Sequence, residues 1–188
     1  MLRFVKYGFI LLFVLATPPM RSLLESIMVT HMHMQMMLLF GVGILIAPLF
    51  QYRLNIGLNT WNASGYPGMV LCLLIISYWM LPRTMDESLE LWWVELFKFI
   101  SLPFLAGMMF RDSWPKLNML SQMMVMIFCT ILFGILGYLY IFAETNLCNN
   151  YVTSDQLAVG WAFMFLTVTL ILYMLLVLFT DQSQYYES

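Results

Sequence analysis

Five mostly apolar stretches dominate this sequence of 188 residues and restrict it to one kind of fold. They lie at roughly residues 23–50, 68–81, 91–110, 118–142 and 157–180. A helix that crosses a membrane needs about 20 mostly apolar residues. A sixth, shorter apolar segment lies at residues 4–16, ahead of Pro18 and Pro19. The sequence therefore predicts an all-α integral membrane helical bundle, a single transmembrane domain over residues 1–188.

The scarcity of charge excludes several other classes of protein. Only 10% of the residues are charged and 62% are hydrophobic, whereas a soluble domain carries about 25% charged residues. A disordered chain needs low hydrophobicity and high charge. A nucleic-acid-binding protein needs a basic surface, and the net charge here is −2. Membrane lipid is the expected surrounding of the chain, and nucleic acid is not an expected partner.

The few basic residues predict how the chain is oriented, because Lys and Arg in short loops collect on the cytoplasmic side. Six spans divide these residues five to two, with Arg3, Lys6, Arg53, Arg111 and Lys116 on one side and Arg21 and Arg83 on the other. Five spans would divide them four to three. We therefore expect six spans, with the segment 4–16 as the first and both termini in the cytoplasm.

The second predicted span carries an unusual polar face. At about 100° per residue, this face comprises Glu25, Met28, His31, Met32, Gln35 and Met36. His33 points nearly opposite His31. Thioether and imidazole ligands suit Cu(I), so His31, Met28, Met32 and Met36 are candidate copper ligands. The alternative is that the methionines fill irregular helix interfaces and that His31 hydrogen-bonds to a neighbouring helix.

The fourth predicted span contributes two more ionisable residues, Glu95 and Lys98. Such groups are rare in a bilayer and are candidates for a functional site. At about 1.5 Å per residue, Lys98 lies about 12 Å and His31 about 14 Å below the outer helix ends, so the two can meet. We expect a polar pocket of Glu25, Gln35, Glu95 and Lys98. Alternatively Glu95 and Lys98, three residues apart on one face, neutralise each other as a structural pair.

The residues that other cofactors and common enzyme classes require are not found in this sequence. Both histidines lie on one predicted helix, so this chain alone is not expected to hold a haem between two helices. Three cysteines are too few for a disulfide framework, and no paired-cysteine metal motif is present. We find no phosphate-binding glycine loop and no Ser, His and Asp order of a hydrolase. Copper is the one candidate cofactor, and a non-catalytic protein is expected.

Several blocks together resemble a family of uncharacterised bacterial multi-pass transmembrane proteins. They are Glu25-Ser26 with Met28, His31-Met32 and Gln35; Trp79 to Arg83 with Asp86; Lys98 to Leu105 with Pro103; and Cys148 to Tyr151 with Asp155-Gln156. The His-Met block, followed by an apolar run to Pro48, is also similar to one helix of the membrane proteins that deliver copper to haem-copper oxidases. There a second histidine typically follows about one turn later, where this chain has Gln35. The resemblance implies a place in the bacterial inner membrane.

The resemblance also implies that the outer loops matter. Arg83 with Asp86, and Asn149 with Asp155, would be pairs that fix two outer loops over the pocket. The leading hypothesis is an accessory subunit or copper-handling assembly factor of a copper-dependent membrane enzyme, either a terminal oxidase or a copper monooxygenase. One alternative is a small proton-coupled transporter, although the repeats and broken helices typical of transporters are not evident. The other is a purely structural subunit of a membrane complex.

Overall fold

Helices make up all the regular structure in the part of the chain that the structure describes. The structure is a computed structural model, and it describes residues 2–53, 60–143, 145, 147–148 and 150–180. The helices in chain order are α1 (Leu2–Ala16), α2 (Pro18–Glu25), η1 (Thr30–Gln35), α3 (Met36–Arg53), α5 (Tyr66–Trp79), α6 (Pro82–Glu90), α7 (Trp92–Ile100), η2 (Ser101–Gly107), α8 (Met108–Ser113), η3 (Trp114–Lys116), α9 (Met119–Phe142) and α10 (Thr153–Phe179). The predicted all-α bundle is confirmed.

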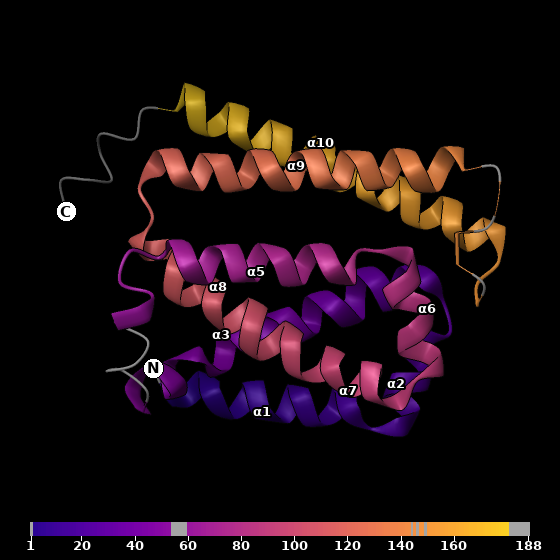
Figure 1. Ribbon diagram of the computed structural model, residues 1–188, viewed down its shortest axis with the longest axis horizontal. Helices are drawn as coiled ribbons and strands as arrows, with labels where there is room; N and C mark the ends of the chain where they lie inside the picture. Colours follow the sequence, from indigo (N-terminus) through magenta and orange to yellow (C-terminus); the bar gives the residue numbers. More distant parts are fainter. Residues whose placement is uncertain (1, 54–59, 144, 146, 149, 181–188) are drawn as a thin grey trace.

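Four of the helical segments are long and apolar enough to cross a membrane. They are Thr30–Gln51, Trp92–Lys116, Met119–Phe142 and Thr153–Phe179. Two bent pairs, α1 with α2 and α5 with α6, raise the number to six if each pair is one span. Helix α1 begins and α10 ends at the same end of the molecule (Figure 1). An even number of crossings requires this arrangement.

The two bent pairs place short polar helices at one end of the bundle, which we call the capped end. The bends are 72° at α1–α2 and 73° at α5–α6, and α2 and α6 lie at the right-hand end of Figure 1. Each bend has an extended residue, Thr17 or Leu81, followed by a proline in the first turn of the next helix. Proline suits the first helical position because that position needs no N–H donor.

The bends correct two expectations about the capped end. The apolar stretch 23–50 is not one helix, since α2 ends at Glu25 and a bend at Ser26 and Ile27 precedes the next helical turn. The expected outer loop after Pro82 is helix α6. Arg83 Nε lies 2.8 Å from Glu87 Oε1, an i, i+4 pair of the kind that favours a helix.

Two π-helical segments, η1 and η2, lie within the spans that form the core. In a π-helix the N–H group bonds five residues back, and such segments often occur at functional sites. The N–H of Met36 bonds to His31 O, and the N–H of Met108 bonds to Pro103 O. Pro103 lies inside η2, within the continuous segment Trp92–Lys116.

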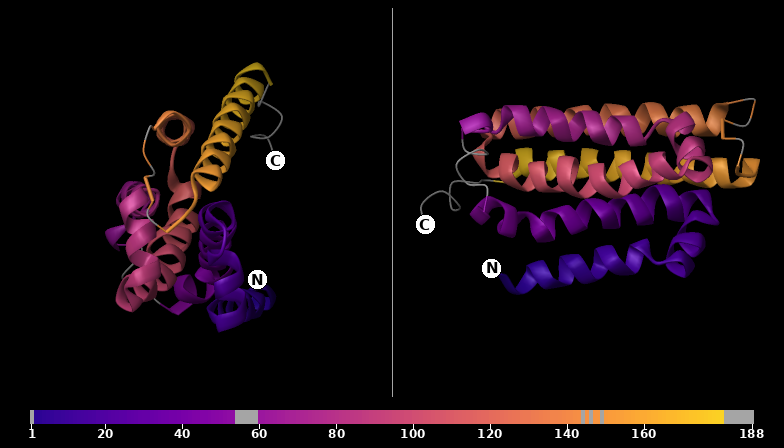
Figure 2. Two further views of the ribbon diagram at one scale, coloured as in Figure 1. Left: turned by 90° about the vertical axis from the view of Figure 1, so that its right-hand side faces the viewer. Right: turned by 60° about the horizontal axis from the view of Figure 1, so that its bottom comes forward.

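Helices α9 and α10 form a hairpin along one flank of the bundle. They lie side by side and cross at an angle (Figures 1 and 2). In the most apolar window of each, only 17% of the residues of α9 and 6% of those of α10 are buried. One contact joins the rings of His33 and Phe163, whose centroids are 4.6 Å apart. Most of the hairpin surface is therefore not covered by the rest of the described chain.

Candidate functional site

A buried lysine is the centre of a polar cluster near the capped end. Lys98 lies on α7, and none of its side chain is exposed. Its Nζ donates to Glu25 Oε1 at 2.7 Å and to Gln35 Oε1 at 3.1 Å. The third neighbour of Nζ is His31 Nε2, at 2.9 Å. An ammonium group has three N–H donors, so each donor of Lys98 has an acceptor.

Local structure explains why these acceptors converge on one point. Glu25 is the last residue of α2 and reaches the cluster because α2 turns back across the end of the bundle. His31 and Gln35 lie four residues apart in η1, and both side chains are fully buried. Gln35 Nε2 also donates to Glu25 Oε1, at 3.3 Å. The cluster therefore joins α2, η1 and α7.

A tyrosine from the segment before α10 fixes the state of His31. Tyr151 OH donates to the backbone oxygen of Glu25 at 2.9 Å and lies 2.9 Å from His31 Nδ1. Because the hydroxyl proton goes to the carbonyl, the hydroxyl oxygen accepts from Nδ1–H. His31 is then a neutral imidazole whose Nε2 accepts from Lys98. Burial, and then the charge of Glu25, raise the pKa of Tyr151, which keeps its hydroxyl protonated.

An arginine completes the cluster from α2. Arg21 Nε lies 3.2 Å from Glu25 Oε2 and also forms an ion pair with Glu95 Oε1. Lys98 pairs with Glu25 and Glu95 pairs with Arg21, so the alternative in which Glu95 and Lys98 neutralise each other is not what the structure shows. The bend before α2 brings Arg21 over α7, where it reaches Glu95. We call these residues the Lys98 cluster: Arg21, Glu25, His31, Gln35, Glu95, Lys98 and Tyr151.

The Lys98 cluster is balanced in charge and deeply buried. Two carboxylates face two cations, and the imidazole is neutral. Side-chain exposure is 8% for Glu25 and 9% for Glu95, against 41% for Arg21. Arg21 is thus the most exposed of these three side chains. A neutral, internally hydrogen-bonded cluster avoids most of the cost of placing charge in a bilayer.

The candidate copper ligands lie beside the cluster. Met28, Met32 and Met36 are 0%, 1% and 2% exposed and belong to the main apolar core. Both ring nitrogens of His31 have protein partners in this arrangement. Among the described residues, no group of three or more His, Cys, Asp or Glu side chains is placed to hold a metal ion. The copper site stays a prediction.

Of the two expected outer-loop pairs, Arg83 with Asp86 is not formed, and Asn149 with Asp155 stays a prediction. Arg83 pairs with Glu87 on its own helix, whereas Asp86 lies 3.4 Å from Asn150 Nδ2. Asn149 lies outside the described residues. Asp155 is in the first turn of α10, where an acidic side chain suits the helix dipole. The contact between Asp86 and Asn150 joins α6 to the segment before α10, so the capped end is held together by different residues.

A second polar cluster, which the sequence reasoning missed, lies at the opposite end. The carboxylate of Asp112 accepts from Asn62 Nδ2 at 2.7 Å and from Gln51 Nε2 at 3.1 Å, and Lys116 Nζ lies 2.7 Å away. The backbone N–H of Gly68 donates to Asn62 Oδ1 at 2.9 Å. Asn62 is fully buried, although its place in a polar loop of the sequence gave no sign of this. These bonds tie the ends of α3, α5 and α8 together.

Comparison of the whole chain with models of protein families, with curated proteins and with solved structures finds no match. The fold and the site therefore define the class of the protein. Over the residues that the structure describes, it is an all-α helical bundle with four to six helical segments able to cross a membrane, and it encloses a buried lysine bound by carboxylate, imidazole and amide groups.

Proposed function

We propose that the protein is a non-catalytic membrane protein that serves a copper-dependent membrane enzyme, as an accessory subunit or as a copper-handling assembly factor. One observation carries this proposal. The imidazole of His31 lies on the same buried helical face as the thioethers of Met28, Met32 and Met36. This ligand chemistry suits Cu(I). The likeness of the His-Met block to one helix of copper-delivering proteins supports the same assignment.

The position of Lys98 means that its ammonium group must move before His31 can bind copper through Nε2. Its ammonium group donates to His31 Nε2, the ring nitrogen nearest to it. The ammonium group is held by one anionic and two uncharged acceptors, and Cu(I) carries the same single positive charge. Copper can use Nε2 only after Lys98 has left it. Lys98 is therefore the side chain that competes with the metal.

Two pairs of variants test copper handling. The protein, purified in mild detergent, is loaded with Cu(I) under reducing conditions, and bound copper is measured by elemental analysis. His31→Ala is compared with His33→Ala, whose ring nitrogens have no hydrogen-bond partner within the described residues. Met32→Leu is compared with Met37→Leu, a half-exposed residue on the same helix. We expect less copper only in the His31 and Met32 variants. Equal copper in all four variants and the wild type would refute copper handling.

A second candidate, a purely structural subunit of a membrane complex, is favoured by the closed hydrogen bonding of the Lys98 cluster. Every donor of Lys98 and both nitrogens of His31 are engaged within the chain. Such a cluster holds the capped end in one shape for a partner. Co-purification in mild detergent identifies that partner. If the complex forms but neither it nor the isolated chain takes up copper, the structural role is the correct one.

We further infer six spans, with both termini on the cytoplasmic side of a bacterial inner membrane. The distribution of Lys and Arg supports this orientation. It places the capped end, and with it the exposed part of Arg21, on the outer side of the membrane. Other subunits of the served complex would then meet the capped end from that side.

A further inference from the structure

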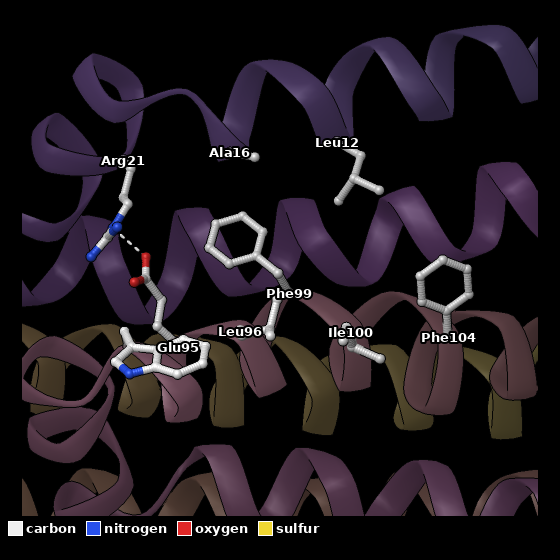
Figure 3. Close-up of a pocket in the computed structure, with 9 residues that line it drawn as sticks. Leu12, Ala16, Arg21, Glu95, Leu96, Phe99, Ile100 and Phe104 are labelled. Carbon is white, nitrogen blue, oxygen red and sulfur yellow. Dashed lines mark ion pairs between the residues drawn. The ribbon is translucent and has the colours of Figure 1, made fainter.

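A groove along the side of the bundle begins at the Lys98 cluster. It has a volume of about 530 Å³. Figure 3 shows Leu12 and Ala16 of α1 along one wall and Phe99, Ile100 and Phe104 along the other. Arg21 and Glu95 lie together at one end, joined by their ion pair. The groove is therefore apolar along its length and charged at the capped end.

The length of the groove matches one leaflet of a bilayer. Its lining includes Trp92, the first residue of a candidate membrane span, and extends to Phe104. Twelve residues of helix at about 1.5 Å each make about 18 Å, and half of the hydrocarbon core is about 15 Å thick. A partner helix would cross the whole core. An acyl chain fills one leaflet, so a lipid fits this groove better than a helix does.

The charged end offers one group of each sign to a ligand. Both ion pairs of Arg21 run through Nε, and 41% of its side chain is exposed. A guanidinium group has five N–H donors, and its terminal fork binds phosphate in a bidentate manner. Glu95 meets Arg21 through Oε1, and a carboxylate can accept from more than one donor. The complementary headgroup carries a phosphate beside a primary ammonium.

We propose that this groove is a binding site for an ethanolamine phospholipid. One acyl chain lies between α1 and α7, the phosphate meets the terminal N–H groups of Arg21, and the ammonium donates to Glu95. A choline headgroup has no N–H to donate, and a glycerol headgroup has no cation. This lipid site does not overlap the candidate copper site, because none of the candidate metal ligands lines the groove.

Native mass spectrometry of the delipidated protein tests the headgroup preference. Ethanolamine, choline and glycerol phospholipids with identical acyl chains are added separately at matched concentrations. We expect the ethanolamine lipid to bind about tenfold more tightly than the other two, which corresponds to about 1.4 kcal/mol for one charge-assisted hydrogen bond. Equal binding of all three lipids would overturn the assignment of the headgroup. Glu95→Gln should reduce the preference of ethanolamine over glycerol.

A variant that blocks the groove tests the location. Ile100→Trp fills the groove from α7 without removing a charged group, and Leu74→Trp places the same side chain on an exposed position of α5 outside it. We expect Ile100→Trp to lose most of the bound ethanolamine lipid and Leu74→Trp to retain it. Size-exclusion profiles show whether both variants are folded. If a folded Ile100→Trp binds as the wild type does, the groove is not the site.

Discussion

Replacing Lys98 with methionine is the most direct test of the cluster. The substitution keeps an unbranched side chain of similar length and removes the ammonium group. Glu25 then loses a partner at 2.7 Å, while Arg21 and Gln35 remain at 3.2 and 3.3 Å. Removing one member of a buried ion pair costs about 3–5 kcal/mol. Because Glu25 keeps Arg21, we expect a loss near the lower limit, about 3 kcal/mol of the free energy of unfolding.

A double-mutant cycle distinguishes the free energy of the Lys98–Glu25 ion pair from nonspecific destabilisation by each substitution. Glu25→Gln alone leaves the ammonium group of Lys98 without a carboxylate and should cost about as much. The double variant buries no unpaired charge, so its loss should be smaller than the sum of the single losses by about 2 kcal/mol. Lys6→Met, at an exposed position of α1, is the matched control and should change stability by less than about 0.5 kcal/mol.

Unfolding in mixed micelles, followed by tryptophan fluorescence, measures these differences. Trp79 is fully buried, and its Nε1 donates to Ser101 at 2.8 Å, so its exposure on unfolding changes the summed emission of the six tryptophans. The reasoning is refuted if Lys98→Met is as stable as Lys6→Met. It is also refuted if the Lys98 and Glu25 losses add without coupling, because a shared ion pair at 2.7 Å must produce coupling.

Three further predictions concern packing, reactivity and topology. A Cβ at Gly43 would meet the backbone of Pro103 and of Gly107, so Gly43→Ala should destabilise the fold by about 1–3 kcal/mol in the same unfolding assay, whereas Gly41→Ala, with open space around it, should not. Burial, and then the charge of Asp86, raise the pKa of Cys148 to about 12. Since thiolate is the reactive form, maleimide should label Cys148 at pH 8 far more slowly than an engineered Val152→Cys, and equal rates would contradict its burial. Reporter fusions at the two termini should both show a cytoplasmic location.

Depth along a helix was the quantity that the sequence predicted best. Counting residues from the helix ends put Lys98 and His31 at similar depth, and their side chains are 2.9 Å apart. The count succeeds because the rise per residue is nearly constant. The residues of the predicted polar face are also found together, since His31 and Gln35, four residues apart, are both fully buried.

Contacts that depend on a bend or a loop were not predictable in this way. A pair of Glu95 with Lys98 is one of the two alternatives that the sequence leaves open, but a 72° bend brings Arg21 over α7, where it pairs with Glu95. Hydrophobic periodicity carries no information about the angle of such a bend. Tyr151, which contacts His31, is 120 residues away in the sequence. It lies in an irregular segment, and hydrophobic periodicity does not predict the path of such a segment. Helical periodicity does not predict the π segments, because it assumes the same number of residues per turn along each span.

The buried lysine also has a consequence for how the chain enters the membrane. The segment that carries Lys98 has a hydropathy of 1.4, the lowest of the four long candidate spans. A lysine within a membrane helix opposes insertion, by about 2.5–3.5 kcal/mol when it lies at the helix centre. Its acceptors on α2 and η1 precede it in the chain by 63 to 73 residues. They are therefore synthesised first. When helix α7 leaves the translocon, it can pack against helices that already provide a carboxylate for its lysine. Insertion of this span therefore depends on the spans made before it.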